Sequence, residues 1–284
     1  MAGRSVGPTS GLEVSNGDTG MTYLLGEELG EGGFGQTFEC TDRFDEKLVA
    51  KVLKPRGTGR AAVKAEWQAE VDHLMTLRHP YITHIFDAFV FGGRHYLILE
   101  RASGAVSELI PIAKRWTVAE REQFVVGTLA RQLLSALHFV HANNVVHRDV
   151  HIDNVLFLVT DQTFTIKLAD FGISKTVGED SGRAYTAIGR EYDVAPELHA
   201  RGYTTAQSDV YQVGLILYHV LTGRPALRDT DGDAAEAILS GVARERAENL
   251  KSRLGGPIAT MLRRTESYRF ASALDAWEAL RDCM

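Results

Sequence analysis

Two short segments of the sequence carry residue types suited to holding the phosphate groups of a nucleotide. The first is the run Gly30-Glu31-Gly32-Gly33-Phe34-Gly35, whose glycines allow the backbone N–H groups to approach phosphate oxygens closely. A dinucleotide-binding fold would enter a helix at this point, whereas Gln36–Cys40 alternates like a strand. The run therefore favours a strand–loop–strand flap over a nucleotide, with a plain glycine-rich hairpin as the alternative.

The second segment is Val49-Ala50-Lys51-Val52-Leu53, which places a lysine in an otherwise apolar strand. Desolvating an ammonium group without a partner is costly, so Lys51 requires an anion close by. Apolar residues at helical spacing over residues 60–77 predict a helix, and Glu70 on this helix is the candidate partner. Either charge alone fits a solvated surface. Because Lys51 follows the flap by 16 residues, the two together predict a unit that positions phosphates.

Further motifs follow in an order that indicates a family. The run His147-Arg148-Asp149-Val150-His151-Ile152-Asp153-Asn154 is followed by Asp170-Phe171-Gly172 and then by Ala195-Pro196-Glu197. With the flap, the strand lysine and the helix glutamate, these motifs have the order and spacing found in eukaryotic-type protein kinases. Across residues 21–284 the sequence resembles that superfamily, and its compact form looks similar to the bacterial Ser/Thr protein kinase domains.

The resemblance implies a role for each matching residue. Lys51 would hold the α- and β-phosphates of ATP and pair with Glu70. Asn154 and Asp170 would hold Mg²⁺. Asp149 would orient the acceptor hydroxyl and take its proton, while the glycine-rich backbone covers the phosphates. These residues share one purpose. A phosphoryl group in transfer carries negative charge spread over its oxygens, and nearby cations stabilise that charge.

The same resemblance implies an adenine slot and a hinge. Backbone groups of Glu100 and Ala102 would form the hinge hydrogen bonds. Leu99 stands at the gatekeeper position, which implies a closed rear pocket, and Val49 replaces a smaller alanine and would narrow the slot slightly. The side chains implied to line the slot are Leu29, Thr37, Val49, Leu99, Leu156 and Ala169.

Other matching residues are expected to be structural. Asp209, within the family-like run Ser208–Gly214, would brace the catalytic loop. Glu197 would form a buried ion pair with Arg269, which stands where the family places an arginine for this purpose.

Departures from the family pattern bear on activity. The usual lysine two residues after the catalytic aspartate, which contacts the γ-phosphate, is here His151. A neutral imidazole donates one hydrogen bond without a permanent charge, so we expect slower catalysis that depends on pH between about 6 and 8. A merely space-filling role for His151 is the alternative. Arg190 and Asp193 replace the family's usual Thr and Tyr before the Ala195-Pro196-Glu197 run, which leaves the acceptor preference open.

Regulation follows from the same comparison. Arg148 precedes the catalytic aspartate, as in kinases whose activation-loop phosphate pairs with this arginine. Thr186 lies eleven residues before Glu197, at the offset of the usual activating site. A phosphate there would add a charge of about −1.5 to −2 and could order the loop through Arg148. Tyr185 and Ser181 are competing sites.

The elements that must position these residues fall into two classes along the chain. The order, strands first and helices afterwards, favours an α+β protein with the two-lobed kinase fold. The N-lobe, an antiparallel β-sheet with one main helix, would span residues 21–102, and the mostly helical C-lobe residues 103–284. Residues 1–20 have few apolar groups and are expected to form a disordered tail. Strand patterns lie at Tyr23–Leu29, Gln36–Thr41, Lys47–Leu53, His95–Glu100, Val155–Val159 and Thr163–Leu168, and the clearest helices at Val118–Asn143 and Val210–Leu221.

Composition narrows the class of protein. Hydrophobic residues make up 44% and charged residues 24%, as in ordinary globular proteins, and the net charge of −6 argues against a dedicated nucleic-acid binder. Cys40 and Cys283 are too few for a disulfide framework and fit a reducing compartment, so we expect a cytoplasmic protein. No apolar run approaches the length of a membrane span. Nothing in the sequence indicates the oligomeric state.

We therefore expect a protein kinase that uses ATP and Mg²⁺ to phosphorylate Ser/Thr hydroxyls of a protein substrate, and its own activation loop. Two alternatives stay open. Small-molecule kinases share the Asp and Asn spacing but generally lack the Ala-Pro-Glu run and the activation-loop layout. A pseudokinase scaffold would have lost Lys51, Asp149 or Asp170, which are all present, although the departures at His151 and Arg190 keep this alternative open.

Overall fold

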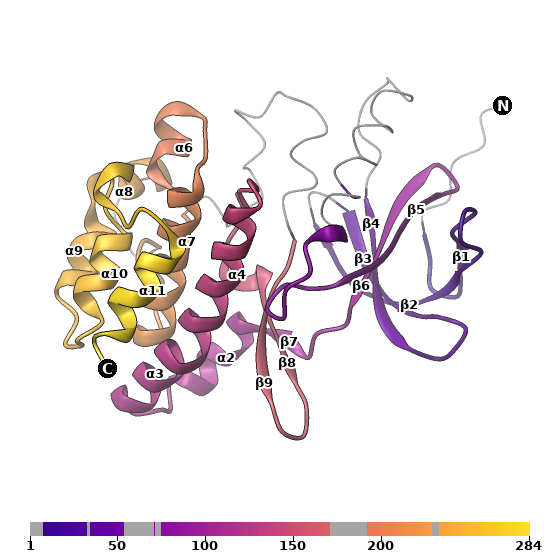
Figure 1. The fold of residues 1–284 in the computed structure, drawn as a ribbon, viewed down its shortest axis with the longest axis horizontal. Helices are drawn as coiled ribbons and strands as arrows, with labels where there is room; N and C mark the ends of the chain where they lie inside the picture. Colours follow the sequence, from indigo (N-terminus) through magenta and orange to yellow (C-terminus); the bar gives the residue numbers. More distant parts are fainter. Residues whose placement is uncertain (1–7, 33–34, 54–70, 72–74, 171–191, 229–232) are drawn as a thin grey trace. The chain divides into compact units, whose positions relative to one another are not determined.

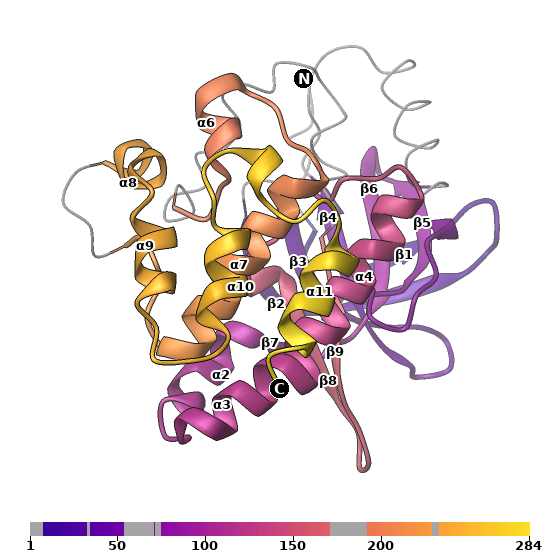
Figure 2. The same ribbon diagram turned by 60° about the vertical axis from the view of Figure 1, so that its left-hand side comes forward.

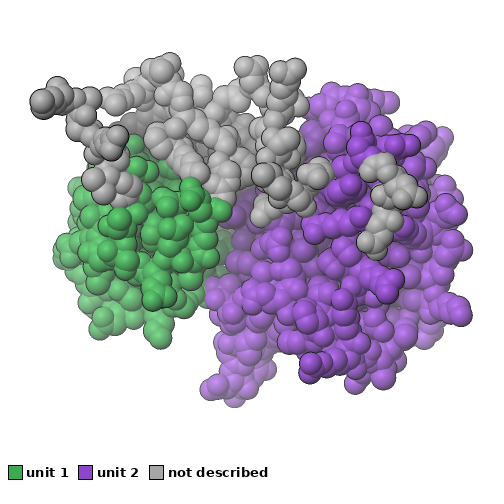
Figure 3. All heavy atoms as spheres, turned by 180° about the vertical axis from the view of Figure 1, so that it is seen from behind, with its two compact units in different colours: residues 1–78, 83–101, 173–177 green, residues 79–82, 102–172, 178–284 purple. Residues whose placement is uncertain are grey.

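The computed structural model describes residues 8–32, 35–53, 71, 75–170, 192–228 and 233–284. The chain divides into two compact units, each with its own hydrophobic core (Figure 3). Unit 1 comprises Met1–Arg78, Thr83–Arg101 and Ile173–Val177, and unit 2 comprises His79–Ile82, Ala102–Gly172 and Gly178–Met284. The predicted α+β class is confirmed, since the described part of unit 1 is mainly strands and that of unit 2 mainly helices (Figure 1).

Unit 1 is built on a six-stranded antiparallel sheet with the strand order β1-β2-β3-β4-β6-β5. Apolar residues at every second position bury one face of these strands. In β4 the buried residues are Leu48, Ala50 and Val52. Most of the predicted helix over residues 60–77 lies outside the described residues. The strands are β1 Glu13–Ser15, β2 Thr22–Gly32, β3 Gly35–Thr41, β4 Lys47–Leu53, β5 Ile85–Phe91 and β6 Arg94–Glu100.

The first strand corrects the prediction of a disordered tail at residues 1–20. Residues 1–7 are outside the described part, but Glu13–Ser15 pairs antiparallel with Thr22–Leu24 of β2. Val14 is fully buried in the core of unit 1 and Asn16 is 5% exposed. The prediction was wrong for residues 8–20 because composition averages over the segment, whereas two buried side chains are enough to anchor it.

A buried hydrogen-bond network joins the two edges of the six-stranded sheet. Asn16 Nδ2 donates to Asp87 Oδ1 at 2.7 Å, and Tyr23 Oη donates to Asp87 Oδ2 at 2.9 Å. Asp87 belongs to β5, at the opposite end of the order from β1, so the twisted sheet curls until its edge strands meet. Burial, with the hydrogen bond to Asp87, raises the pKa of Tyr23. The Tyr23 ring also stacks on Phe89, with centroids 5.8 Å apart.

Unit 2 combines a small sheet, in the order β7-β8-β9, with a set of helices. Figure 2 shows α7, α10 and α11 side by side, in agreement with their mutual contacts. None of the helices in the described ranges has the length and hydrophobicity needed to cross a bilayer. The elements are β7 Gly104–Ala105, β8 Val155–Val159, β9 Phe164–Leu168, α2 Val106–Ala113, α3 Val118–Phe124, α4 Arg131–Ala142, α6 Pro196–Arg201, α7 Ala206–Thr222, α8 Ala234–Ser240, α9 Val242–Glu248, α10 Gly255–Met261 and α11 Ala273–Arg281, with a π-helical turn at Val125–Ala130 and 3₁₀ turns at Ile152–Asn154 and Glu266–Tyr268.

The long helix predicted at Val118–Asn143 is present but not uniform. It passes through the π-helical turn between α3 and α4, and a glycine, Gly127, lies within that turn. Just beyond the turn, the buried Gln132 accepts a hydrogen bond from the backbone N–H of Ile166 in β9 at 2.6 Å. The predicted stop is confirmed, because α4 ends at Ala142 and Asn144 has a left-handed backbone with φ of 59°.

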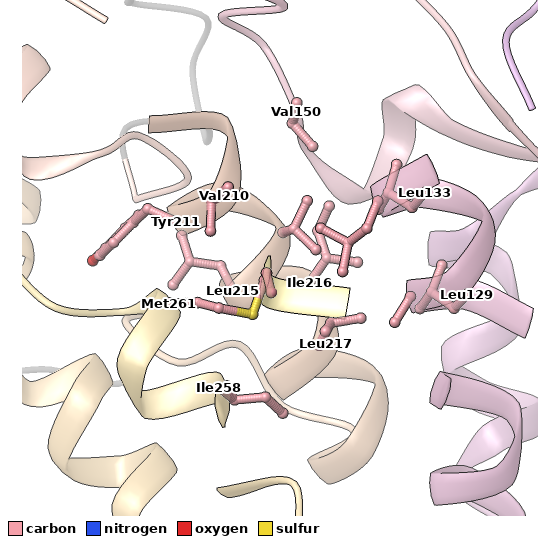
Figure 4. Packing of buried hydrophobic residues seen from close by; sticks show 14 of the residues in the cluster. Leu129, Leu133, Val150, Val210, Tyr211, Leu215, Ile216, Leu217, Ile258 and Met261 are labelled. Atoms are coloured by element: carbon pink, nitrogen blue, oxygen red, sulfur yellow. The ribbon is translucent and has the colours of Figure 1, made fainter. Parts of the chain in front are cut away.

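The core of unit 2 is centred on α7 (Figure 4). Leu215 and Leu217 of this helix are buried among residues of the α3–α4 helix and of α10. Gly214 allows the close approach of α10, because a side-chain carbon there would lie 3.0 Å from Met261. This packing fixes α7, which carries residues that hold the catalytic loop.

Removal of the buried acceptor Asp87 tests the closure of the sheet. In Asp87→Ala the buried Tyr23 hydroxyl and Asn16 amide lose their partner, and we expect the free energy of unfolding to fall by about 2–4 kcal/mol. Tyr23→Phe removes one donor and should cost about 1 kcal/mol. Urea or thermal unfolding measures both. Asp18→Ala, an exposed change in the turn after Asn16, is the control, and an Asp87→Ala variant as stable as this control would contradict the closure.

Candidate active site

The glycine-rich run lies between two paired strands, as the strand–loop–strand prediction requires. β2 ends at Gly32 and β3 begins at Gly35, with Gly30 paired to Thr37 across the hairpin. A side-chain carbon at Gly35 would lie 2.1 Å from the carbonyl oxygen of Val52 in β4, so only glycine fits here. A side-chain carbon at Gly30 would meet nothing within 4 Å, which leaves that face of the backbone open to a ligand. Gly33 and Phe34 lie outside the described residues.

Lys51 lies near the middle of the sheet of unit 1. It belongs to β4, opposite Thr37 of β3 and Leu97 of β6, and is half-buried. Because paired strands flank it on both sides, the sheet holds its backbone rigidly. The predicted partner Glu70 lies outside the described residues, so the Lys51–Glu70 pair stays a prediction.

The backbone of the candidate catalytic loop in unit 2 is hydrogen-bonded to one buried carboxylate. Asp209, in the first turn of α7, is fully buried and accepts hydrogen bonds from the backbone N–H groups of His147 and Arg148, both at 2.9 Å. His141 Nε2 lies 2.8 Å from the same carboxylate. Ionised carboxylates form strong hydrogen bonds with such donors, so Asp209 fixes the loop backbone directly before Asp149.

His147 links this loop to the segment that follows β9. Its Nδ1 accepts the backbone N–H of Asp149 at 3.3 Å, so the ring proton of the neutral side chain is on Nε2. His147 Nε2 lies 3.0 Å from the carbonyl oxygen of Ala169, to which it donates. The fully buried ring thus connects the backbone at Asp149 with the residue before Asp170.

Asn154 and Asp149 are in direct contact. Asn154 is 5% exposed, and its Nδ2 donates to the Asp149 backbone oxygen at 3.0 Å and lies 3.5 Å from the Asp149 carboxylate. These contacts fix the orientation of the amide, with Nδ2 toward Asp149 and Oδ1 directed away from it. The amide oxygen of Asn154, the atom suited to a metal, therefore lies on the side of the amide that faces away from Asp149.

The β8–β9 hairpin brings Asn154 and Asp170 to the same end of the small sheet. Val155 pairs with Leu168, and the backbone N–H of Ala169 donates to the carbonyl oxygen of Asn154 at 2.9 Å. The flanking residues Asn154 and Asp170 must therefore be neighbours. Their amide and carboxylate oxygens are the ligands that Mg²⁺ prefers, and Mg²⁺ typically takes few protein ligands together with phosphates and water. The residues present fit the predicted metal, although no group of three or more metal-binding side chains occurs in the described ranges.

His151 points at the same carboxylate. It is only 3% exposed, and its Nδ1 accepts the backbone N–H of Asp153 at 3.3 Å, which places the proton of the neutral ring on Nε2. His151 Nε2 lies 3.9 Å from Asp149 Oδ2. The residue that replaces the family lysine thus directs an N–H group toward the Asp149 carboxylate.

Two residues of the site have a strained backbone that sequence reasoning missed. Arg148 has φ of 69° and Asp170 has φ of 59°, in the left-handed region that disfavours side-chain-bearing residues. Such strain persists only where the surroundings enforce it, and it is concentrated at functional sites. Neither residue type predicts this conformation, so only the backbone could have revealed it.

The remaining predicted site residues are distributed over both units. Leu29, Thr37, Val49, Leu99 and Glu100 belong to unit 1, and Ala102, Leu156 and Ala169 to unit 2, so the adenine slot and the hinge stay predictions. Thr186 lies outside the described residues.

A buried ion pair lies at the first turn of α6. Arg269 binds Glu197 through two N–H···O contacts of 2.7 Å, and its other donors reach the carbonyl oxygens of Arg263, Gln207 and Arg264. All five N–H groups of the guanidinium are therefore satisfied. Burial favours the neutral acid, but the hydrogen bonds and charge of Arg269 outweigh it and lower the pKa of Glu197. The predicted pair is confirmed in the structure.

Comparison with known proteins gives the family context. The sequence profile described as "Protein kinase domain" matches residues 23–277. A Lactococcus lactis protein named "Probable serine/threonine-protein kinase PknB" is 32% identical over 219 residues, which cover 76% of this chain and 33% of that protein. "Calcium-dependent protein kinase 29" of Arabidopsis thaliana is 33% identical over 248 residues, which cover 84% of this chain and 44% of that protein. The chain thus spans less than half of either relative.

A solved structure shares the fold. The kinase domain of Mycobacterium tuberculosis PknI has a TM-score of 0.65 at 22% identity, with 98% of this chain and 100% of that chain covered. The predicted two-lobed α+β fold is confirmed by this similarity.

Loss of Arg269 tests the buried pair. Arg269→Ala leaves the carboxylate of Glu197 buried without its partner, and we expect the free energy of unfolding to fall by about 3–5 kcal/mol. Urea unfolding measures the change. Arg263→Ala removes an exposed side chain nearby and keeps the backbone carbonyl that Arg269 uses. Equal stability of the two variants would show that the pair contributes little.

Acid should weaken the same pair. Because the pKa of Glu197 is lower in the folded chain than its ordinary 4.5, the unfolded chain binds more protons between the two values. The stabilisation is complete above 4.5 and is lost as the pH falls through the folded pKa. We expect Glu197→Gln to lose stability less steeply on acidification than the parent, as followed by thermal unfolding over a pH series. Parallel curves would rule out this contribution.

Proposed function

Because this chain belongs to the protein kinase family, we propose that it transfers the γ-phosphoryl group of Mg·ATP to serine and threonine hydroxyls of proteins, its own included. The observation that carries the proposal is the junction at Asp149, where Asn154, His151 and the end of the β8–β9 hairpin converge. The name of the Lactococcus lactis relative supports the Ser/Thr acceptor.

In the proposed reaction, Asp149 orients the acceptor hydroxyl and takes its proton. The hydroxyl oxygen forms a bond to the γ-phosphorus as the bond to the bridging oxygen of ADP breaks, and ADP leaves with that electron pair. The contact of Asn154 Nδ2 with Asp149 Oδ2 limits rotation of the carboxylate, and His151 Nε2 lies 3.9 Å from the same oxygen. Such positioning supplies much of the catalysis, because phosphoryl transfer requires little covalent chemistry from the protein.

Each unit contributes residues that are proposed to bind the nucleotide. In unit 1, Lys51 would bind the α- and β-phosphates, and the N–H groups of the glycine flap would cover them. In unit 2, Asn154 and Asp170 would hold Mg²⁺, which screens the charge on the phosphates. Phosphorylation of Thr186, with Arg148 as its partner, is the proposed activating step.

Phosphate incorporation tests the proposal directly. With Mg·ATP we expect mass-resolved phosphorylation of the parent chain, including Thr186, and a loss of at least about a thousandfold in Asp170→Ala and in Asp149→Asn. Asp161→Asn, at the exposed tip of the same hairpin, is the matched control and should react like the parent. Incorporation that persists in both active-site variants would contradict the proposal.

The alternatives predict other outcomes of this assay. An absence of phosphorylation, with Mg·ATP binding seen by thermal shift, would favour a scaffold or a small-molecule acceptor. Phosphorylation that is unchanged in Thr186→Ala, in both rate and extent, would remove the activating role of that residue.

His151 provides a separate test. His151→Leu keeps a side chain of similar bulk but loses the N–H group that faces Asp149, and we expect kcat to fall roughly tenfold with KM for ATP unchanged. His151→Gln retains a neutral donor and should be intermediate. Steady-state kinetics on a fixed acceptor measures both variants. A His151→Leu variant with the parent kcat would show that His151 only fills space.

A further inference from the structure

A pocket in unit 2 adjoins the catalytic loop but contains none of the nucleotide-binding residues. We call it the acceptor-side pocket. Three consecutive residues of the catalytic loop, directly after Asp149, form one wall, and α7 with the segment that follows it forms the other. Figure 4 shows Val150, Leu215 and Ile216, which belong to its lining. The lining residues are Val150, His151, Ile152, Tyr192, Asp193, Gln212, Leu215, Ile216, His219, Pro225, Ala226, Leu227 and Arg228.

The position of this pocket is fixed by α7. Gln212, Ile216 and His219 follow the i, i+4, i+7 spacing and so share one face of the helix. Gln212 Oε1 accepts the backbone N–H of Val150 at 3.3 Å, and its Nε2 donates to the carbonyl oxygen of Asp193 at 2.9 Å. The same helix face therefore holds the catalytic loop and presents His219 to the pocket.

His219 is a polar group in a mostly apolar surround. Its ring is half-buried, and no hydrogen bond of the ring is found among the described residues. Burial first, and then the positive charges of Arg228 and Lys114, lower its pKa to about 4, while the carboxylate of Asp153 opposes them more weakly. The imidazole is consequently neutral near pH 7, with one N–H donor and one acceptor available.

The two cations that lower the pKa of His219 belong to separate parts of unit 2. Arg228 lines the pocket, and its Nη2 lies 3.4 Å from Asp193 Oδ2. Lys114 follows α2, and its stem passes over Gly223, where a side-chain carbon would lie 2.9 Å from it. These two positive charges disfavour protonation of His219 more strongly than Asp153 favours it. A negative group is the complementary occupant.

We propose that the acceptor-side pocket binds a carboxylate side chain of the acceptor segment, so that this kinase selects serine or threonine residues flanked by Asp or Glu. The inference rests on the proposed protein kinase activity and adds the substrate class. The loop residues directly after Asp149 line the same pocket as His219 and Arg228, so a segment whose hydroxyl reaches Asp149 has this pocket close by for a flanking side chain. The imidazole N–H of His219 would donate to the carboxylate, and the positive charge of Arg228, which lines the same pocket, would attract it.

A scanned peptide panel tests the inference. Each peptide has one acceptor serine in an Ala/Gly background, with a single Glu, Gln or Lys moved through every flanking position. We expect at least one position where Glu exceeds Lys in kcat/KM by roughly fivefold or more. His219→Glu and Arg228→Glu should reverse that preference toward Lys. Arg224→Glu adds the same charge to the same connection outside the pocket and should leave the parent ratio unchanged.

A binding measurement keeps the test valid if a variant is inactive. Peptides with alanine in place of the acceptor serine are titrated against each chain in the presence of Mg·ADP, and the Glu-to-Lys ratio of dissociation constants should change as the kinetic ratio does. Transfer by the parent without a preference between Glu and Lys, or a preference unaffected by both reversals, overturns the inference alone. An absence of transfer to every peptide, by a chain that binds Mg·ATP, overturns the proposed function and the inference together.

Discussion

The carboxylate of Asp209 lies fully buried in the first turn of α7, where it accepts the backbone N–H groups of His147 and Arg148 and contacts the His141 ring. An unpartnered carboxylate at such depth would be strongly unfavourable, so these donors are required once Asp209 is buried. The positive end of the helix dipole favours the charge at the same place. The loop backbone before Asp149 is thereby tied to the most buried helix of unit 2.

Further hydrogen bonds next to Asp209 fix the tautomer of His147 and the orientation of the Asn154 side chain. His147 can accept from Asp149 and donate to Ala169 in only one neutral tautomer. Asn154 contacts Asp149 through Nδ2, which turns the amide oxygen of Asn154 away from Asp149. The left-handed backbone at Arg148 and Asp170 is the strain that such a network maintains. Groups held in this way need little reorganisation when charge develops on a transferring phosphoryl group.

Much of this arrangement could be predicted from the sequence, because local rules determine it. The alternation in Lys47–Leu53 and the pairing of Val155–Val159 with the strand that precedes Asp170 both follow from short-range patterns, as does the helix stop after Ala142. The buried pair of Glu197 with Arg269 followed from family resemblance, since 72 residues separate the partners and no local pattern connects them.

The features that could not be predicted depend on tertiary contacts. β1 exists because Val14 and Asn16 find partners in strands far along the chain, and no property of residues 8–20 alone indicates this. The strand Ile85–Phe91 does not alternate cleanly, because Asp87 faces inward as the acceptor that closes the sheet. From the sequence alone, an aspartate at this position predicts a turn, because its two hydrogen-bond donors come from residues far away in the sequence.

Two of the departures from the family pattern lie on the proposed acceptor side of the site. His151 and Asp193, which replace the family's lysine and tyrosine, both line the pocket that contains His219. Lysine at position 151 would carry a fixed positive charge, whereas His151 is buried and directed at Asp149. Within the described ranges, the cations that affect His219 are then Arg228, which Asp193 contacts, and Lys114. The two substitutions therefore leave the residues proposed to bind the nucleotide unchanged and alter the charges on the proposed acceptor side, a pattern that agrees with retained chemistry and a different substrate choice.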